Sequence, residues 1–220
     1  MPPAKSLPKP STKKEDRCLS AADFTMAVTA GWKRSREKSE PASLLLLDLD
    51  GLHELNTTHG HAEGDRAIDA TIGALAKAAK ADGWTVGRIG GDEFGLFAPG
   101  VTTEAAFLRA EALRREVDVA IAKAVQHGSA TASIGVASSP RDAKSPDELM
   151  RKADLALYAA KDQGGGSVAL TPSDDMVLKS SYYSTAQLGR LRSLAERMKK
   201  KEAVLLREAL DDLLRKHERS

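Results

Sequence analysis

A Gly-Gly pair between two short apolar segments most constrains how this chain can fold. Residues 84–89 and 94–98 are apolar enough to lie in a sheet, and Gly90 and Gly91 stand between them. A Gly-Gly pair can supply the positive φ angles of a tight hairpin turn. Asp92 and Glu93 follow directly, although acidic residues are poor strand formers. The pattern therefore predicts a hairpin that carries either a site for a hard cation or a solvated acidic turn.

A second pair of acids closes a run of leucines. Residues 42–47 are apolar over the length of a strand and lead into Asp48-Leu49-Asp50, with Gly51 next. Side chains two positions apart lie on the same side of a strand, but Gly51 predicts a turn, so Asp48 is the safer ligand. If this strand lies beside the hairpin, Asp48 and Asp92 converge. Two carboxylates plus phosphate oxygens suit Mg²⁺, and such a pair can support phosphoryl or nucleotidyl transfer.

Periodicity and turn signals predict helices that alternate with strands around the hairpin. The helices are expected at residues 20–38, 64–81, 103–126 and 145–163. Strands are expected at residues 42–47, 130–137 and 167–170, besides the hairpin. Ser145-Pro146-Asp147-Glu148 is typical of a helix start. His59 and His61 are expected in a loop that leads into a helix. The fold class is an α/β sandwich with a central sheet, mixed or antiparallel in the middle.

The chain resembles the GGDEF-domain diguanylate cyclases over about residues 17–170. The motifs that carry the resemblance are Asp48-Leu49-Asp50, Asn56, residues 60–65, residues 90–94, residues 133–136 and residues 153–161. The resemblance implies a fold similar to the palm of nucleotide polymerases. It also implies condensation of two GTP molecules into cyclic di-GMP with release of pyrophosphate.

The resemblance assigns a role to each candidate site residue. It implies that Asp48 and Asp92 hold Mg²⁺ (or Mn²⁺) with help from the Leu49 carbonyl, and that Asp92 or Glu93 assists deprotonation of the attacking hydroxyl. Asn56 and Asp65 would read the guanine edge. The remaining substrate contacts would come from His53, Lys161 and Gly91.

Residue chemistry agrees with a guanine contact at Asp65. A carboxylate can accept hydrogen bonds from the N1–H and the exocyclic amine of guanine together, and adenine offers no such pair of donors. An amide such as that of Asn56 can both donate and accept. The other interpretation of Asp65 is an acid at the start of a helix, where the helix dipole favours it.

Three departures from the family pattern bear on activity. His53 stands where a phosphate-binding lysine is usual, and Gly165 stands where an arginine is common. Slow turnover, or GTP binding alone, is therefore possible, although activity is the favoured interpretation. Ala81 and Trp84 replace the Arg and Asp of a common product-inhibition motif, so feedback through that site is not expected.

Composition limits the class of protein. The 220 residues suffice for one domain of about 150 residues and a small module. Residues 1–16 are predicted to be a disordered basic tail, since they are rich in Pro, Ser and Lys. Cys18 is the only cysteine, which suits a reducing cytoplasm. No apolar run approaches the roughly 20 residues that span a bilayer, so no membrane association is expected.

Residues 171–176 form a predicted linker, and the segment beyond it is basic. Residues 176–220 hold 11 Lys and Arg against 6 Asp and Glu, a net charge of +5. Residues 177–220 are predicted to form a short extended segment and two helices, the first capped by Ser184. They resemble a ribbon-helix-helix module, the fold of small dimeric repressors, through Tyr182-Tyr183-Ser184 and the leucine spacing of residues 188–198 and 205–210. A plain helical hairpin or dimerisation device is the other interpretation.

The ribbon-helix-helix resemblance implies a homodimer and contact with DNA. The candidate DNA-binding residues are Ser180, Tyr182, Lys199, Lys200 and Lys201. Two functions remain open. One is a diguanylate cyclase that its C-terminal module dimerises and can also tether to DNA. The other is a DNA-binding regulator whose weakly active or inactive GGDEF domain senses GTP or cyclic di-GMP.

Overall fold

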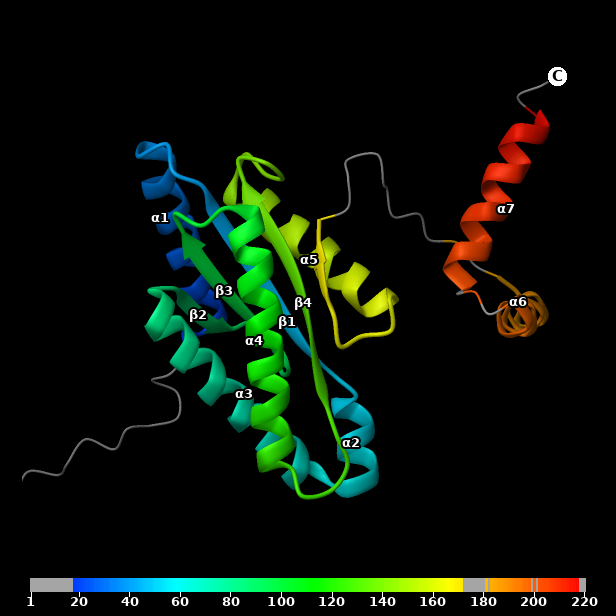
Figure 1. Cartoon of the computed structure of the whole chain (residues 1–220), viewed down its shortest axis with the longest axis horizontal. Helices are drawn as coiled ribbons and strands as arrows, with labels where there is room; N and C mark the ends of the chain where they lie inside the picture. The colour runs from blue at the N-terminus through cyan, green and yellow to red at the C-terminus, as the bar shows by residue number, and fades with distance from the viewer. Residues whose placement is uncertain (1–17, 172–180, 182, 199, 201, 218–220) are drawn as a thin grey trace, which may run out of the picture. The chain divides into compact units, whose positions relative to one another are not determined.

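The computed structural model describes residues 18–171, 181, 183–198, 200 and 202–217. These residues fall into two compact units that divide after residue 175. The larger unit is an α/β domain, and the smaller unit contains two helices (Figure 1).

The larger unit is built on a mixed five-stranded sheet in the order β2-β3-β1-β4-β5. The strands are β1 (Ala42–Asp50), β2 (Thr85–Arg88), β3 (Glu93–Pro99), β4 (Thr131–Ser139) and β5 (Val168–Leu170). Only β5 pairs in parallel, with β4, and the other neighbours are antiparallel. The leucine run therefore forms the central strand, with the acidic hairpin on one side. This arrangement confirms the predicted α/β fold with a mixed central sheet.

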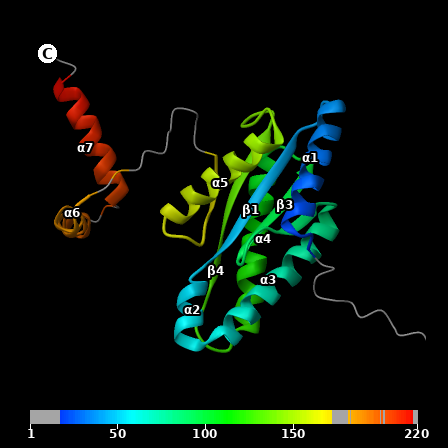
Figure 2. The same cartoon turned by 180° about the vertical axis from the view of Figure 1, so that it is seen from behind.

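Helices cover both faces of the sheet (Figures 1 and 2). α3 (His61–Asp82) and α4 (Thr103–Ala124) cover one face, and α1 (Ala21–Glu37) and α5 (Pro146–Asp162) cover the other. β1 contributes side chains to the hydrophobic cores on both faces of the sheet, because successive side chains of a strand point to opposite faces. Leu45 and Leu47 belong to the core beneath α3 and α4, whereas Leu44 and Leu46 belong to the core beneath α1 and α5. By the same alternation, Asp48 and Asp50 lie on the α5 face.

The predicted helix start at Ser145 is confirmed. Its hydroxyl accepts a hydrogen bond from the N–H of Glu148, and Pro146 occupies the first helical position. Ser20 and Thr102 cap α1 and α4 in the same way. Each hydroxyl satisfies an N–H that has no partner within its helix.

One helix was not expected from the sequence. α2 (Leu52–His59) follows β1, and α3 begins at His61 rather than Gly64. Gly51 adopts a φ of 77°, which lets the chain turn sharply out of the strand. Leu52 and Leu55 bury one side of α2. This packing outweighs the modest helix propensity of Asn56-Thr57-Thr58, so the expectation of a loop around His59 was wrong.

The smaller unit pairs α6 (Thr185–Met198) with α7 (Glu202–His217). Ser184 caps α6 as predicted, since its hydroxyl accepts from the N–H of Gln187. Ala195 and Leu205 are buried. Several large apolar side chains stay exposed, namely Leu188, Met198, Leu206, Leu210, Leu213 and Leu214. The expected ribbon falls on residues outside the described part of the chain, apart from Ser181 and Tyr183.

Within the described residues, no helix is both long and apolar enough to cross a membrane.

Candidate active site

Asp48 lies near the end of the central strand and is enclosed by both neighbouring strands. Its register partners are Glu93 on β3 and Ser133 on β4. Directly opposed residues of antiparallel strands project to the same face, so Glu93 and Asp48 share the α5 face. Only 7% of Asp48 is exposed. The two acidic motifs, far apart in the sequence, thus meet at this edge of the sheet as expected.

The hairpin loop differs from the predicted turn. Residues 89–92 connect β2 to β3, and neither Gly90 nor Gly91 has a positive φ. The expectation of a tight turn with positive φ was wrong, because the loop is longer and closes through backbone hydrogen bonds from Ile89 and Gly90 to the carbonyl of Glu93. The Arg88 guanidinium also donates to the carbonyls of Gly90 and Gly91. A Cβ on Gly90 would lie 2.9 Å from Oε2 of Glu93, the end of an exposed and flexible side chain that can move aside.

Lys161 lies next to Asp48. Its Nζ is 2.6 Å from Oδ1 of Asp48, and it extends from the last turn of α5. The family resemblance predicted a phosphate contact for this residue. Its position beside the proposed metal ligand brings Lys161 to the same small region, so one ammonium group can serve both the carboxylate and a bound phosphate.

The electrostatics of Asp48 favour a cation at this position. Burial raises the pKa of Asp48 above the ordinary value of 3.8, the ion pair with Lys161 opposes that rise, and the nearby charges of Asp92 and Glu93 add to it. A buried carboxylate close to two others gains when a positive charge is added. Three carboxylates against one ammonium group therefore leave an excess of negative charge that a divalent cation would offset.

The described residues do not form a complete metal cage. No group of three or more His, Cys, Asp or Glu side chains is arranged to hold a metal within the described part of the chain. Mg²⁺ usually keeps several waters and takes one or two carboxylates together with substrate phosphates. Asp48 and the nearby Asp92 can supply the carboxylates of such a partial site, and the part of the Leu49 carbonyl stays a prediction.

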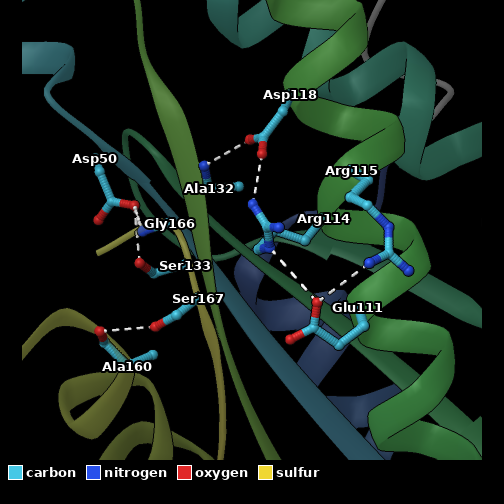
Figure 3. A network of polar contacts seen from close by, with 10 residues as sticks. All are labelled: Asp50, Glu111, Arg114, Arg115, Asp118, Ala132, Ser133, Ala160, Gly166 and Ser167. Carbon is cyan, nitrogen blue, oxygen red and sulfur yellow. Dashed lines mark hydrogen bonds and ion pairs between the residues drawn. The ribbon is translucent and has the colours of Figure 1, made fainter. Parts of the chain in front are cut away.

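Asp50 belongs to a different set of contacts (Figure 3). Its Oδ2 accepts hydrogen bonds from the Ser133 hydroxyl at 2.8 Å and from the Gly166 N–H at 2.9 Å. The Thr131 hydroxyl lies 3.3 Å from the same oxygen. These contacts occupy the carboxylate, which agrees with the choice of Asp48 over Asp50 as the metal ligand. No local pattern indicates this role, because Gly166 lies 116 residues further along the chain.

The two predicted guanine contacts are neighbours. Asn56 lies on α2, and its side chain packs against Gly64, the residue before Asp65. A side chain at position 64 would collide with the Asn56 amide. The Oδ1 atom of Asn56 is buried and has no hydrogen-bond partner in the described protein. A buried acceptor without a partner costs free energy, but this atom packs against Gly64, so a ligand reaches it only if the side chain turns. Asp65 itself is exposed.

His53 and Gly91, the other predicted substrate contacts, are exposed on α2 and on the hairpin loop respectively. In the described part of the chain, no contact of either residue supports a role in substrate binding. For the DNA-binding candidates, Ser180, Tyr182, Lys199 and Lys201 lie outside the described residues. Lys200 is described, and its Nζ lies 2.6 Å from Oε1 of Glu208.

Glu63 was missed by sequence reasoning, although it sits within the motif of residues 60–65. It is only 4% exposed, and its carboxylate accepts from the backbone N–H of Gln126 at 2.9 Å and from Arg66 at 2.6 Å. The hydrogen bond from Gln126 is the main reason that the pKa of Glu63 is lowered. Glu63 thereby holds the start of α3, beside Asp65, to the segment that follows α4.

The family signature extends across the whole of this arrangement. The family described as "Diguanylate cyclase, GGDEF domain" matches residues 21–167, which is more than half of the chain. The chain belongs to the GGDEF family. The match covers every element of the sheet except the last strand, and it leaves the two C-terminal helices outside.

Individual relatives share the domain but are longer. Diguanylate cyclase A of Treponema denticola is 32% identical over 144 residues, covering 64% of this chain and 38% of that protein. An uncharacterized protein of Mycobacterium tuberculosis is 38% identical over 135 residues, covering 61% of this chain and 22% of that protein. This GGDEF chain therefore spans well under half the length of these curated relatives.

A solved structure has the same fold. The GGDEF domain of DgcB from Caulobacter crescentus, crystallised with c-di-GMP, is 25% identical to this chain with a TM-score of 0.65. The similarity covers 78% of this chain and 100% of the DgcB domain. The larger unit is thus a GGDEF domain in both sequence and fold.

Proposed function

We propose that this GGDEF protein is a diguanylate cyclase that condenses two GTP molecules into cyclic di-GMP and releases two pyrophosphates. The observation that carries the proposal is the meeting of Asp48, Glu93 and Lys161 at one edge of the sheet. This edge combines buried negative charge for a cation with an ammonium group for phosphate.

Each residue has a role that follows from its place. Asp48 and Asp92 hold the divalent cation, which when bound screens the triphosphate and polarises the α-phosphate. Glu93, exposed at the start of β3, is placed to accept the proton of the attacking 3′-hydroxyl, with Asp92 as the other candidate base. Lys161 would bind the phosphates, since its ammonium group would be repelled by a cation held at Asp48.

The pair of Asn56 and Asp65 selects the base. Asp65 accepts from the N1–H and the exocyclic amine of guanine, and the unpartnered Oδ1 of Asn56 accepts a further hydrogen bond once this side chain turns. Adenine lacks this row of donors. A site built around hydrogen bonds rejects analogues that cannot make them, so GTP is favoured over ATP.

The residues at positions 53 and 165 are expected to lower the rate of cyclic di-GMP formation. His53 and Gly165 replace the cationic residues that the family commonly uses on phosphates, and Gly165 has a φ of +75°. An arginine side chain would be strained at that backbone conformation. The chain thus relies on Lys161 as its main phosphate contact, and we expect turnover to be slow.

The C-terminal helices bring together the two GGDEF domains that the reaction needs. Each GGDEF domain holds one GTP, so cyclisation needs two domains face to face. Leu210 and Leu213 on α7 are each 54% exposed, and an apolar helix face of this kind is buried when two chains associate. A dimer made by α6 and α7 raises the effective concentration of the second domain. The net charge of +5 in residues 176–220 supports an additional tether to DNA phosphates.

Product analysis tests the proposal. The full chain is incubated with GTP and Mg²⁺, and products are identified by mass, with ATP and Asp65→Asn as controls for base choice. Cyclic di-GMP from GTP and no cyclic product from ATP is the expected result. If the chain binds GTP without forming any cyclic dinucleotide, the regulator function replaces the cyclase. A salt-dependent shift of duplex DNA, lost when residues 176–220 are deleted, then supports that second function.

A further inference from the structure

Asp50 ends the central strand and fastens the turn that follows α5. Three hydrogen bonds converge on its Oδ2 atom, two from β4 hydroxyls and one from the backbone N–H of Gly166. Figure 3 shows those from Ser133 and Gly166. The β4 hydroxyls belong to Thr131 and Ser133, the residues that pair with the end of β1. The carboxylate therefore joins the end of β1 to the loop that leads from α5 into β5, in addition to the pairing of β5 with β4.

The turn after α5 is shaped to approach this carboxylate. Gly164, Gly165 and Gly166 have φ values of 107°, 75° and 60°, which side chains other than glycine rarely adopt. A Cβ on Gly165 would lie 3.0 Å from Cγ of Asp50. The glycine turn, residues 164–166, thus passes directly against Asp50.

The other end of the glycine turn is fixed to the residue that carries the ammonium group. The N–H of Gly164 donates to the Lys161 carbonyl at 2.9 Å, and the N–H of Gly165 donates to the Ala160 carbonyl at 3.3 Å. The Ser167 hydroxyl also donates to the Ala160 carbonyl (Figure 3). Two acids of β1 therefore hold Lys161 at two points, Asp48 at its Nζ and Asp50 through the glycine turn that ends its helix.

We propose that Asp50 is a positioning residue that fixes Lys161 for the triphosphate of GTP. This inference rests on the proposed function, because it takes Lys161 as a phosphate contact. Asp50 holds the end of α5 against the sheet, so the Lys161 backbone stays fixed when its ammonium group moves from Asp48 to phosphate. The aspartate that follows the metal ligand by two positions thus acts on the nucleotide through backbone placement and not through the metal.

A purely structural role would affect all ligands alike, so two probes separate the possibilities. Guanosine tests the base contacts alone, and the non-reacting GTP analogue with a methylene bridge between the α- and β-phosphates adds the triphosphate. Dissociation constants for both are measured by calorimetry with Mg²⁺. The variants are Asp50→Asn, Lys161→Met and the double variant. Ser133→Ala is the matched control, because it removes one hydrogen bond from Asp50 and leaves the Gly166 contact in place.

The expected result is a split between the two probes. Asp50→Asn weakens binding of the analogue about fivefold to tenfold, as a weakened charged hydrogen bond implies, and changes guanosine binding less than about twofold. It has no further effect once Lys161 is replaced, and Ser133→Ala binds both probes like the wild type. Equal weakening of both probes, additive losses in the double variant, or a folded Asp50→Asn protein with wild-type affinity would each overturn the inference. If the wild type itself fails to bind the analogue, the proposed function fails first.

Discussion

The ammonium group of Lys161 lies 2.6 Å from the carboxylate of Asp48, which places the proposed phosphate contact on the proposed metal ligand. A divalent cation and this ammonium group compete for the same carboxylate. If a metal–nucleotide complex binds at Asp48, it would replace Lys161 as the partner of this carboxylate and release Lys161 toward the phosphates. This exchange would give Asp48 and Lys161 both of their proposed roles.

The exchange predicts opposite effects of Lys161→Met on two ligands. Binding of Mg²⁺ alone should become tighter, because the competing charge is gone. Binding of the Mg²⁺ complex of the GTP analogue should weaken by about tenfold, since a charged hydrogen bond to phosphate contributes roughly 1.5–3 kcal/mol. Titration calorimetry at pH 8 measures both constants. Lys161→Arg keeps the charge and should stay near the wild type, and weaker binding of Mg²⁺ alone by Lys161→Met would contradict the exchange.

Asp48→Asn should abolish activity without a loss of stability at neutral pH. The pKa of Asp48 is raised in the folded state, so the ionised carboxylate destabilises the fold. The stabilising contribution of the protonated form is fully present below the unfolded pKa and is lost as the pH rises through the folded pKa. The variant should therefore melt at or above the wild-type temperature at pH 8. The melting temperature of the wild type should approach that of the variant as the pH falls through the raised pKa of Asp48. Thermal melting from pH 8 to pH 4 checks this order, and a clearly less stable variant at pH 8 would refute it.

Glu63→Gln should show the opposite pH dependence. The hydrogen bond from the Gln126 N–H lowers the pKa of Glu63 below its ordinary 4.5. A lowered pKa gives stability that is present above the unfolded value and is lost as pH falls through the folded value. The variant should be less stable than the wild type at pH 7, and the difference should shrink below pH 4.5. Urea denaturation at pH 7 and pH 3.5 measures it, and a constant difference would rule out the ionised carboxylate as its cause.

Gly135 and Gly73 form a matched pair that tests the packing of α5. A Cβ on Gly135 in β4 would collide with the backbone of Leu157 and Ala153 in α5, whereas a Cβ on Gly73 in α3 has no atom within 4 Å. Gly135→Ala should cost about 1–3 kcal/mol or more. Gly73→Ala should stabilise by roughly 0.5–1 kcal/mol, as expected for a helix interior. Similar free energies of unfolding for the two variants would contradict the close contact of α5 with the sheet.

Much of this domain could be predicted from the sequence because its signals are local. The leucine run and its closing acids indicated the central strand, and Ser145-Pro146 indicated the start of α5. α2 was missed because Leu52 and Leu55 stabilise it by tertiary packing rather than by propensity. The loop at Gly90 was misjudged because it is longer than a two-residue turn and closes through backbone hydrogen bonds to the Glu93 carbonyl.

Long-range polar contacts could not be predicted. The bond between Asp50 and the Gly166 N–H joins positions 116 residues apart, and no pattern in either segment indicates the other. The same holds for Glu63 and Gln126, which are 63 residues apart. Asp48 and Lys161 were each identified as functional, but their contact became visible only once β1 and α5 were packed together.

The proposed function requires the acids at this edge of the sheet to hold the cation with which the enzyme forms cyclic di-GMP. The most direct test measures pyrophosphate release and cyclic dinucleotide formation from GTP and Mg²⁺ by the wild type and by Asp92→Asn, which keeps the shape of the side chain. We expect the wild type to release two pyrophosphates for each cyclic di-GMP that it forms. We also expect a loss of about 100-fold or more in the variant, because a metal ligand that stabilises developing charge is removed. Equal rates for the two proteins, or no cyclic product from the wild type, would contradict the proposed function.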